Sequence, residues 1–375
     1  LEHIPYELTG LAAKRPMIVT DKGVRAAGLL DPVVAACEES GLEIISIYDD
    51  VPPDSSTDVV RDIAGIYRNE KCDSIIAVGG GSAIDTAKAV NILVSEGGDD
   101  IAAYSGAGVI KHPLKPFLVV PTTAGTGSEV TSVAVITDTT KSVKLPFTSS
   151  FLLPNAAVID PRMTLTLPPH ITAATAMDAM THATEAFTCM AKNPLSDAYA
   201  TAAIKKISTS LLQVMDNPKD SDGRLELAQA STMAGIAFSN SMVGLVHALG
   251  HATGAICHLP HGLCMSLYLP YVLEYNLESI RAPLGELLLY LEGPDVYSAT
   301  PASRRGEASI SALRKLRDEL HKRCKLPRTL KETGSVEEHQ LDTIAEMAMD
   351  DGAMMFNPKE VSLEDARAVL KRAWA

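Results

Sequence analysis

The sequence predicts a two-part α/β fold: a parallel β-sheet covered by helices, followed by an all-helical region. Up to about residue 165, short apolar runs alternate with segments of helical period, which is typical of a parallel sheet with helices on both faces. After Pro168 and Pro169 the chain is rich in Ala, Leu and Met and has no convincing strand. At 375 residues the chain is long for a single hydrophobic core. We therefore expect two domains, residues 1–165 and 166–375.

The elements of the first domain follow from hydrophobic periodicity. Apolar and β-branched runs predict strands at residues 17–21, 43–48, 74–78, 117–120 and 156–160. Helical spacing between these runs predicts helices at residues 23–40, 57–70 and 84–95. Residues 130–136 and 143–147 flank a Thr-Asp-Thr-Thr-Lys turn and predict a β-hairpin. In the second domain, prolines punctuate the helical pattern, and residues 292–305 are expected to form a polar loop.

Paired acidic and histidine side chains in the second domain predict a metal site. His247 and His251 are four residues apart, as are Asp178 and His182, so each pair lies on one face of a helix. His261 follows a proline and precedes a glycine, which predicts a loop beyond that helix. One carboxylate and several imidazoles are ligands that suit a borderline divalent metal ion such as Fe²⁺ or Zn²⁺.

Spacing does not decide which histidines would bind the metal. His251 and His258 are equally plausible ligands from their positions alone. A histidine on an apolar helix can instead be a hydrogen-bonded core residue. Four of the ten histidines fall within residues 244–261, and this concentration favours the metal site.

A glycine-rich turn, Gly79-Gly80-Gly81-Ser82, joins a predicted strand to a predicted helix. Glycines let a ligand approach the backbone closely, and the free N–H groups and dipole of a helix start favour an anion. Ser82 would be a helix cap or a phosphate donor, and Asp85 lies in the first turn. The turn is neither a G-x-G-x-x-G motif nor a P-loop. A plain strand-to-helix turn is the alternative.

A second polar loop, residues 121–129, follows the strand expected at residues 117–120. Its hydroxyl residues suit contacts to phosphate, ribose or nicotinamide, because parallel sheets bind ligands at the carboxyl ends of their strands. A solvated loop is the alternative. Asp21 ends the first predicted strand, where a carboxylate would bind the adenosine ribose and repel a 2′-phosphate, favouring NAD over NADP. An aspartate that only caps the next helix would look the same.

Composition and charge argue against several partners and locations. The net charge of −13 would repel nucleic acid and anionic membranes. We find no apolar run long enough to span a bilayer and no signal peptide. The six cysteines contain no C-x-x-C pair, which indicates free thiols in a reducing cytoplasm. The sequence begins at Leu1 without a methionine, so we expect part of the N-terminus to be missing.

Taken together, these motifs resemble the iron-containing, group III alcohol dehydrogenases. The resemblance is carried by Gly-Gly-Gly-Ser-Ala-Ile-Asp-Thr-Ala-Lys, Pro-Thr-Thr-Ala-Gly-Thr-Gly-Ser-Glu-Val-Thr, Asp-Ala-Met-Thr-His-Ala-Thr-Glu-Ala, Gly-Leu-Val-His-Ala-Leu-Gly-His and Pro-His-Gly. These segments occur in the family's order up to about residue 276, and the last hundred residues match more weakly, through Asn357-Pro358-Lys359. The resemblance implies a Rossmann-like nucleotide domain, an all-helical metal domain of the dehydroquinate synthase-like kind, and a cleft between them.

The resemblance also implies a role for individual residues. The metal, Fe²⁺ or alternatively Zn²⁺, would be bound by Asp178, His182, His247 and His261. His251 would lie near the nicotinamide without binding the metal. The cofactor, NAD or alternatively NADP, would contact Asp21, Gly80, Gly81, Ser82, Asp85, Thr122, Thr123, Thr126, Ser128 and Lys144.

Two departures from the family's pattern matter. Sequences of this family usually open with a strand and a Gly-x-Gly-x-Leu turn. In this chain only Leu1-Glu2 resembles the end of that segment. Many relatives carry Asn-Pro-Thr where this chain has Asp54-Ser55-Ser56, near the adenosine end of the cofactor. This second departure leaves the choice between NAD and NADP open.

The expected activity is reversible oxidation of a primary alcohol to an aldehyde by hydride transfer to the nicotinamide, with the metal as Lewis acid. His251 would pass the proton to solvent, or would instead orient His247 or the substrate. A small apolar wall at residues 235–243 and around Cys257 suits a short aliphatic alcohol or diol. The alternatives are a metal-dependent lyase, cyclase or hydrolase of the related sugar-phosphate fold, and a non-catalytic metal-sensing protein. Relatives are often dimers or larger, so we expect a homo-oligomer.

Overall fold

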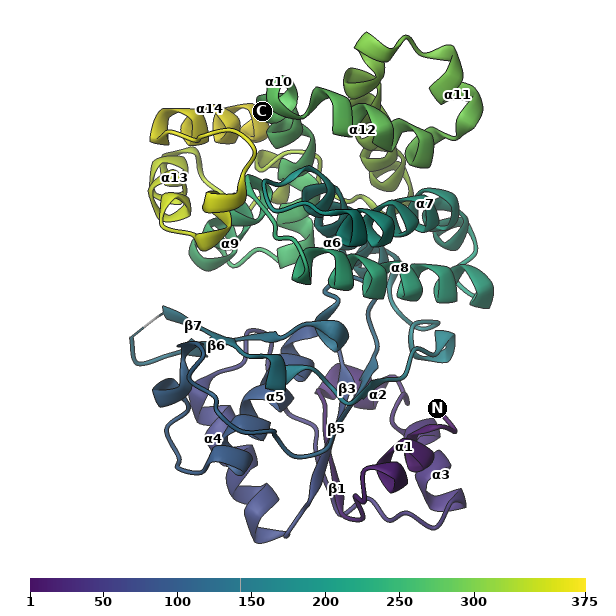
Figure 1. The fold of residues 1–375 in the computed structure, drawn as a ribbon, viewed down its shortest axis with the longest axis vertical. Helices are drawn as coiled ribbons and strands as arrows, with labels where there is room; N and C mark the ends of the chain where they lie inside the picture. Colours follow the sequence, from purple (N-terminus) through teal and green to yellow (C-terminus); the bar gives the residue numbers. More distant parts are fainter. Residues whose placement is uncertain (142) are drawn as a thin grey trace. The chain divides into compact units, whose positions relative to one another are not determined.

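The computed structural model describes residues 1–141 and 143–375, which form two compact units, Leu1–Thr166 and Leu167–Ala375 (Figure 1). The first unit contains a five-stranded parallel sheet flanked by helices, and the second is helical throughout its described residues. The expected fold class is therefore confirmed. None of the described helices combines the length and the apolarity that crossing a bilayer requires.

The parallel sheet of the first unit has the strand order β2-β1-β3-β5-β8. Every residue of β1, β3 and β5 is buried, which explains why these strands read as continuous apolar runs in the sequence. The strands span Pro16–Val19 (β1), Ser46–Tyr48 (β2), Ser74–Gly79 (β3), Phe117–Pro121 (β5) and Ala156–Ala157 (β8).

Successive residues of the central strand β3 belong to two different hydrophobic clusters. Ile75 and Ala77 pack in a cluster with residues of α4 and α5, whereas Ile76 and Val78 pack in a cluster with residues of α1 and α3. This alternation is the period of two of a β-strand, and it buries both faces of the sheet. The helices of the unit span Ile4–Gly10 (α1), Lys22–Ala26 (α2), Asp31–Glu39 (α3), Thr57–Asn69 (α4) and Gly81–Glu96 (α5).

The predicted hairpin is confirmed, but its strands are in a second sheet. β6 (Val133–Asp138) and β7 (Val143–Thr148) pair antiparallel, and β4 (Gly106–Ala107) pairs with β7 to give the order β4-β7-β6. One residue of the predicted connection, position 142, lies outside the described residues.

Three predicted elements of the chain are wrong in part. The helix expected at residues 23–40 is two helices, because Gly28 adopts a φ of 70° and turns the chain between α2 and α3. The strand expected at residues 156–160 pairs only at Ala156–Ala157, and Asp160 instead caps a 3₁₀ turn. The loop expected at residues 292–305 contains the helix α11 (Pro294–Ala299), which begins with a proline as helices often do.

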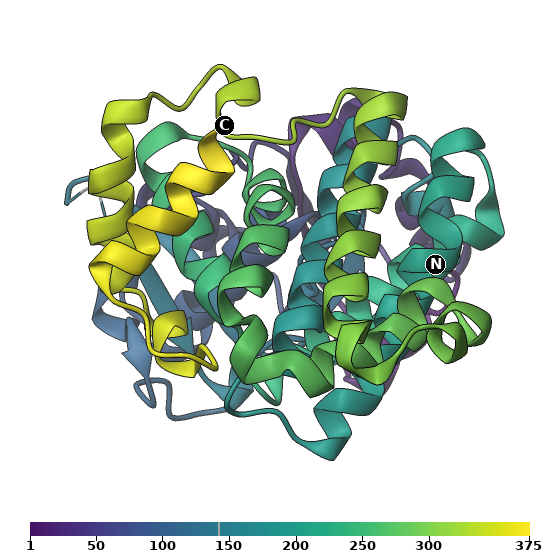
Figure 2. The ribbon, with the colours of Figure 1, turned by 90° about the horizontal axis from the view of Figure 1, so that it is seen from above.

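The second unit is organised around α6 (Pro169–Thr188), which packs against α7, α8 and α10. Residues 176–189 are all buried, and their many Ala and Thr side chains allow this close packing. α14, the yellow helix of Figure 2, lies beside α13 and α10. The remaining helices span Pro194–Asp216 (α7), Ser221–Ser239 (α8), Leu245–Cys257 (α9), His261–Glu292 (α10), Arg305–Cys324 (α12), Leu341–Met349 (α13) and Leu363–Trp374 (α14).

Helix α10 continues through Pro270 and Pro283, so Pro270 does not end a helix as its sequence context predicts. Short 3₁₀ turns complete both units, at Ile101–Tyr104, Ser128–Val130, Ser150–Leu152, Pro161–Met163, Ala302–Arg304, Lys331–Thr333, Glu338–Gln340 and Gly352–Phe356.

Candidate metal centre and nucleotide-binding loops

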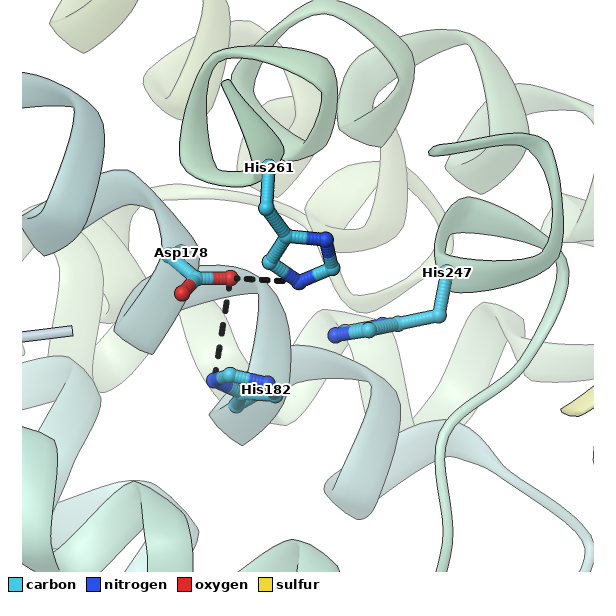
Figure 3. A group of neighbouring side chains, drawn as sticks. All are labelled: Asp178, His182, His247 and His261. Atoms are coloured by element: carbon cyan, nitrogen blue, oxygen red, sulfur yellow. Dashed lines mark ion pairs between the residues drawn. The ribbon is translucent and has the colours of Figure 1, made fainter. Parts of the chain in front are cut away.

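Four side chains of the helical unit point toward one another, as Figure 3 shows: Asp178, His182, His247 and His261. One donor atom of each lies within 4.8 Å of the donor atoms of the other three. Asp178 Oδ1 is 3.4 Å from His261 Nε2 and 3.9 Å from His182 Nδ1. Asp178 and His182 lie one turn apart on α6, and His247 lies on α9, as the four-residue spacings predict.

His261 is the first residue of α10, so its predicted place in a loop is wrong. Pro260 precedes it with a φ of −56°, a value that suits entry into a helix, and its carbonyl accepts hydrogen bonds from the backbone of the first turn. The next residue, Gly262, lets α10 approach α6 closely. A Cβ at Gly262 would lie only 2.5 Å from the carbonyl oxygen of Ala174 on α6. The glycine therefore allows His261 to reach Asp178.

Three donor atoms of this cluster are buried without a hydrogen-bond partner among the described residues: Asp178 Oδ1, His182 Nδ1 and His247 Nε2. A buried polar atom without a partner is costly, and such atoms usually have a partner in water or an ion. Three nitrogen donors and one carboxylate oxygen are a ligand set that suits Fe²⁺ or Zn²⁺. The residues present therefore fit a divalent transition-metal ion.

The electrostatics of the cluster favour the protonation states that metal binding requires. Burial lowers the pKa of His182 to about 3 and holds the pKa of His247 well below its usual value, so both rings are neutral near pH 7. Burial alone would raise the pKa of Asp178, but the imidazoles of His182 and His261 hold it below its usual range. Neutral imidazoles and an ionised carboxylate are the ligand forms.

Glu185 is a residue of this site that sequence reasoning missed. Its Oε2 lies 2.5 Å from His247 Nδ1, and its Oε1 accepts a hydrogen bond of 2.8 Å from Val246 N. Both side chains are buried, and burial raises the pKa of Glu185 to about 7. Because Nδ1 is engaged, Nε2 is the nitrogen of His247 that faces the cluster. Glu185 is seven residues after Asp178, on the same face of α6, and this spacing could have revealed it.

Phe238 is a second residue of this site that sequence reasoning missed. Its ring stacks on that of His182, with centroids 4.4 Å apart and planes at 21°. Phe238 lies within residues 235–243, the apolar segment that was expected to line the substrate site.

His251 and His258 lie outside the group of four donors. His251 Nδ1 is 2.8 Å from Asp351 Oδ2, and its ring stacks on that of His261 with centroids 5.3 Å apart. The His251 side chain is 48% exposed, so it has access to water. Asp351 was not anticipated from the sequence, since it is 100 residues away. His258 is an exposed residue at the end of α9, with a φ of 55°.

In the first unit, the glycine turn and the polar loop pack directly against each other. A Cβ at Gly81 would lie 2.9 Å from Thr126 Cγ2, and a Cβ at Gly80 would lie 3.2 Å from Thr123 Cγ2. The glycines are therefore required for this contact as well as for any approach by a ligand. Gly80 is the N-cap residue of α5, with no side-chain cap, so the expected capping role of Ser82 is wrong. The helix start keeps N–H groups that suit an anion.

Asp21 serves as a helix cap and also lies beside the glycine turn. Its Oδ1 accepts a hydrogen bond of 2.9 Å from Val24 N at the start of α2. Its Oδ2 would lie 3.5 Å from a Cβ at Gly79. The two alternatives left open by the sequence are thus compatible, because one oxygen caps the helix while the other is directed toward the turn.

The remaining candidate cofactor residues have protein partners. Ser128 Oγ donates a hydrogen bond of 2.6 Å to Asp85 Oδ1, and Val135 N donates one of 3.0 Å to Asp85 Oδ2. Lys144 Nζ on β7 forms an ion pair of 2.9 Å with Asp54 Oδ1. Thr122 is buried and donates its N–H to the carbonyl of Gly79, which joins the loop to the turn.

Comparison with known proteins identifies the family. The family model for iron-containing alcohol dehydrogenase matches residues 1–161, and that for the C-terminal part of the Fe-containing alcohol dehydrogenase family matches residues 172–374. The chain is 34% identical over 376 residues to an NAD-dependent methanol dehydrogenase of Bacillus methanolicus, covering 100% of this chain and 96% of the relative.

Comparison with solved structures supports the same family assignment. A 1,3-propanediol oxidoreductase superimposes with a TM-score of 0.95 at 34% identity, covering 100% of this chain and 95% of the other. A sulfoacetaldehyde reductase from Bifidobacterium kashiwanohense in complex with NAD+ gives a TM-score of 0.87 at 26% identity, covering 99% and 94%. These relatives are oxidoreductases, so the lyase, cyclase and hydrolase alternative is not favoured. The chain belongs to the iron-containing alcohol dehydrogenase family and is a metal-dependent, NAD-linked alcohol dehydrogenase.

Proposed function

We propose that this enzyme interconverts short primary alcohols or diols and their aldehydes. The observation that carries the proposal is the set of three buried donor atoms, on Asp178, His182 and His247, that have no hydrogen-bond partner among the described residues, with His261 beside them. Relatives named for methanol and for 1,3-propanediol support a short substrate. The aldehyde reductase among the solved structures supports use of the reverse direction as well.

In this proposal the four clustered side chains hold the metal. A divalent ion bound there supplies Lewis acidity, which lowers the pKa of an alcohol oxygen or polarises an aldehyde carbonyl. The protein's part is to keep the imidazoles of His182 and His247 neutral by burial and to keep Asp178 ionised. Glu185 holds His247 in one orientation, and Phe238 restricts the ring of His182.

His251 is proposed to move the proton that alcohol oxidation releases. Asp351 engages its Nδ1, which leaves Nε2 as the nitrogen that exchanges a proton. Half of the side chain is exposed, so water can receive that proton. Orienting His247 or the substrate is the alternative role for His251.

The nucleotide is proposed to bind the two packed loops of the first unit. The uncapped start of α5 suits the pyrophosphate, and Asp21 suits the adenosine ribose, which favours NAD over NADP. The proposed contacts are Asp21, Gly80, Gly81, Ser82, Asp85, Thr122, Thr123, Thr126, Ser128 and Lys144.

The cysteines support a location in the reducing cytoplasm. All six are free thiols, at positions 37, 72, 189, 257, 264 and 324. Disulfides form and persist mainly in oxidising compartments. A cytoplasmic enzyme would keep these thiols reduced.

We also propose that the enzyme is a homo-oligomer, a dimer or larger. Met190, Leu195 and Met355 are large apolar side chains that are exposed on the second unit. A hydrogen bond from Met190 N to the carbonyl of Phe356 brings two of them to one region. Apolar surface of this kind is typical of an interface. Light scattering coupled to size exclusion would measure the mass, and a monomer would contradict this proposal.

The activity itself is tested with protein depleted of metal and then reconstituted with Fe²⁺ or Zn²⁺. Absorbance at 340 nm should rise with NAD and 1-butanol or 1,3-propanediol, and it should fall with NADH and the aldehydes. Activity should be absent before reconstitution. No change over a broad panel of alcohols with either metal would contradict the proposal.

A further inference from the structure

Lys88 is a charged residue buried within the first unit, with 0% of its surface exposed. It lies on α5, seven residues after the helix begins at the glycine turn. Its Nζ donates hydrogen bonds to Thr131 O at 2.8 Å, to Thr131 Oγ1 and Val133 O at 2.9 Å, and to Ser128 Oγ at 3.2 Å. A buried ammonium is retained only when partners compensate for its lost hydration, and here one segment of the chain supplies all four.

That segment, residues 128–135, runs from the end of the polar loop into β6. Asp85, one turn before Lys88 on α5, binds the same segment at two points, Ser128 Oγ and Val135 N. The hydroxyl of Ser128 accepts from Lys88 and donates to Asp85, so its orientation is set from both sides. The opposite charges of Asp85 and Lys88 lie one turn apart, and the buried Glu129 adds a second carboxylate.

A continuous chain of contacts links Lys88 to the glycine turn. Lys88 holds Ser128, whose backbone N–H donates a hydrogen bond of 3.2 Å to Thr126 Oγ1. The methyl group of Thr126 in turn packs on Gly81, where a Cβ would approach it to 2.9 Å. Loss of the ammonium would therefore release the polar loop from the turn at which the pyrophosphate is proposed to bind.

We infer that Lys88 is a positioning residue for nucleotide binding: it fixes Ser128 and the polar loop, residues 121–129, against the glycine turn. It does not contact the nucleotide, because its side chain is fully buried. This inference rests on the proposed nucleotide site. It implies that the site is pre-formed, so that binding does not have to order the loop.

The test compares wild-type enzyme with Lys88→Met, which keeps an unbranched side chain and removes the charge and the donors. NADH affinity is measured by fluorescence titration. We expect the Kd to rise by about tenfold or more, because the variant loses one charged hydrogen-bond network. Metal affinity should not change, because the metal ligands lie in the other unit. The kcat at saturating NADH should stay within about threefold, since the reacting groups are intact.

Hydrogen–deuterium exchange without cofactor separates this inference from the proposed function. Exchange in residues 121–135 should be faster in Lys88→Met than in wild type, and unchanged in α1 and α3. If wild-type enzyme binds no NADH, the nucleotide site is refuted, while the exchange result still decides the role of Lys88 in the loop.

Two further variants complete the design. Lys206→Met is the matched control, since Lys206 also binds two side chains, Glu226 and Gln229, but lies in the helical unit. It should leave the Kd for NADH unchanged. Thr131→Val removes the hydroxyl that accepts one of the hydrogen bonds from Lys88. It replaces Lys88→Met in the test if that variant does not fold. Its Kd for NADH and its exchange in residues 121–135 should rise less than expected for Lys88→Met. A folded variant with unchanged NADH affinity and unchanged exchange would overturn the inference.

Discussion

Glu185 Oε2 lies 2.5 Å from His247 Nδ1, and this pair connects the central helix α6 to α9 inside the helical unit. The same carboxylate accepts a hydrogen bond from Val246 N, so it fixes both the backbone at the start of α9 and the imidazole ring. His247 Nε2 is left facing Asp178 and His182 without a hydrogen-bond partner of its own among the described residues. The carboxylate thus selects the nitrogen that is available to a metal ion.

Replacing Glu185 by glutamine should weaken metal binding by about 10- to 100-fold, because one amide oxygen cannot serve both Val246 and His247. Affinity is measured by competition with a chromophoric chelator. Asp351→Asn is the matched control, since it alters the partner of a histidine outside the four donors, and its metal affinity should equal that of wild type. Equal affinity of Glu185→Gln and wild type would show that the pair does not orient the ligand.

Replacing His251 by glutamine should lower kcat by about tenfold or more, because a positioned proton acceptor is lost and bulk water replaces it only in part. Metal content should remain at the wild-type level, because His251 is not among the four donors. An unaltered kcat with a raised KM would instead assign His251 to substrate orientation.

Replacing Asp21 by serine should relax the preference for NAD over NADP. Serine still caps α2, so the fold is retained, while the charge that repels a 2′-phosphate is removed. We expect the ratio of kcat/KM for NADP to that for NAD to rise by about tenfold. Steady-state kinetics with both cofactors measure it. A constant ratio would indicate that selectivity lies elsewhere, for example at the Asp54–Lys144 ion pair.

Lys88 predicts a pH dependence of stability. Burial lowers its pKa to about 8 from 10.5, in spite of the carboxylates of Asp85 and Glu129. Between pH 8 and pH 10.5 the unfolded chain therefore binds more protons than the folded chain at this residue, so its contribution to the free energy of unfolding rises with pH.

Urea denaturation across that window should show the free energy of unfolding of wild type increasing relative to Lys88→Met, by at most about 3 kcal/mol. The comparison of the two proteins removes the contributions of groups that they share. A difference that is flat or that falls as the pH rises would contradict the lowered pKa of Lys88.

Local patterns predicted the elements better than the contacts between them. The buried strand Ser74–Gly79 and the four-residue spacing of Asp178 and His182 are visible in a window of a few residues. The break at Gly28, the continuation of α10 through Pro270 and the helix at Pro294–Ala299 depend on tertiary packing that such a window does not contain.

The same limit applies to the candidate sites. The partners of the key side chains lie far away in sequence: Glu185 is 62 residues from His247, and Asp351 is 100 residues from His251. Lys88 donates hydrogen bonds to Ser128 and Val133, which lie 40 and 45 residues later in the chain. No periodicity relates such positions, so only the folded structure could show them.

The central claim is that Asp178 and the three histidines bind one divalent metal ion. Anomalous diffraction at the iron or zinc edge, from crystals of reconstituted enzyme, tests it most directly. We expect one strong peak in the helical unit, within about 2.0–2.3 Å of a donor atom of each of Asp178, His182, His247 and His261. A peak at another position, or no peak while these four side chains keep their present arrangement, would contradict the assignment.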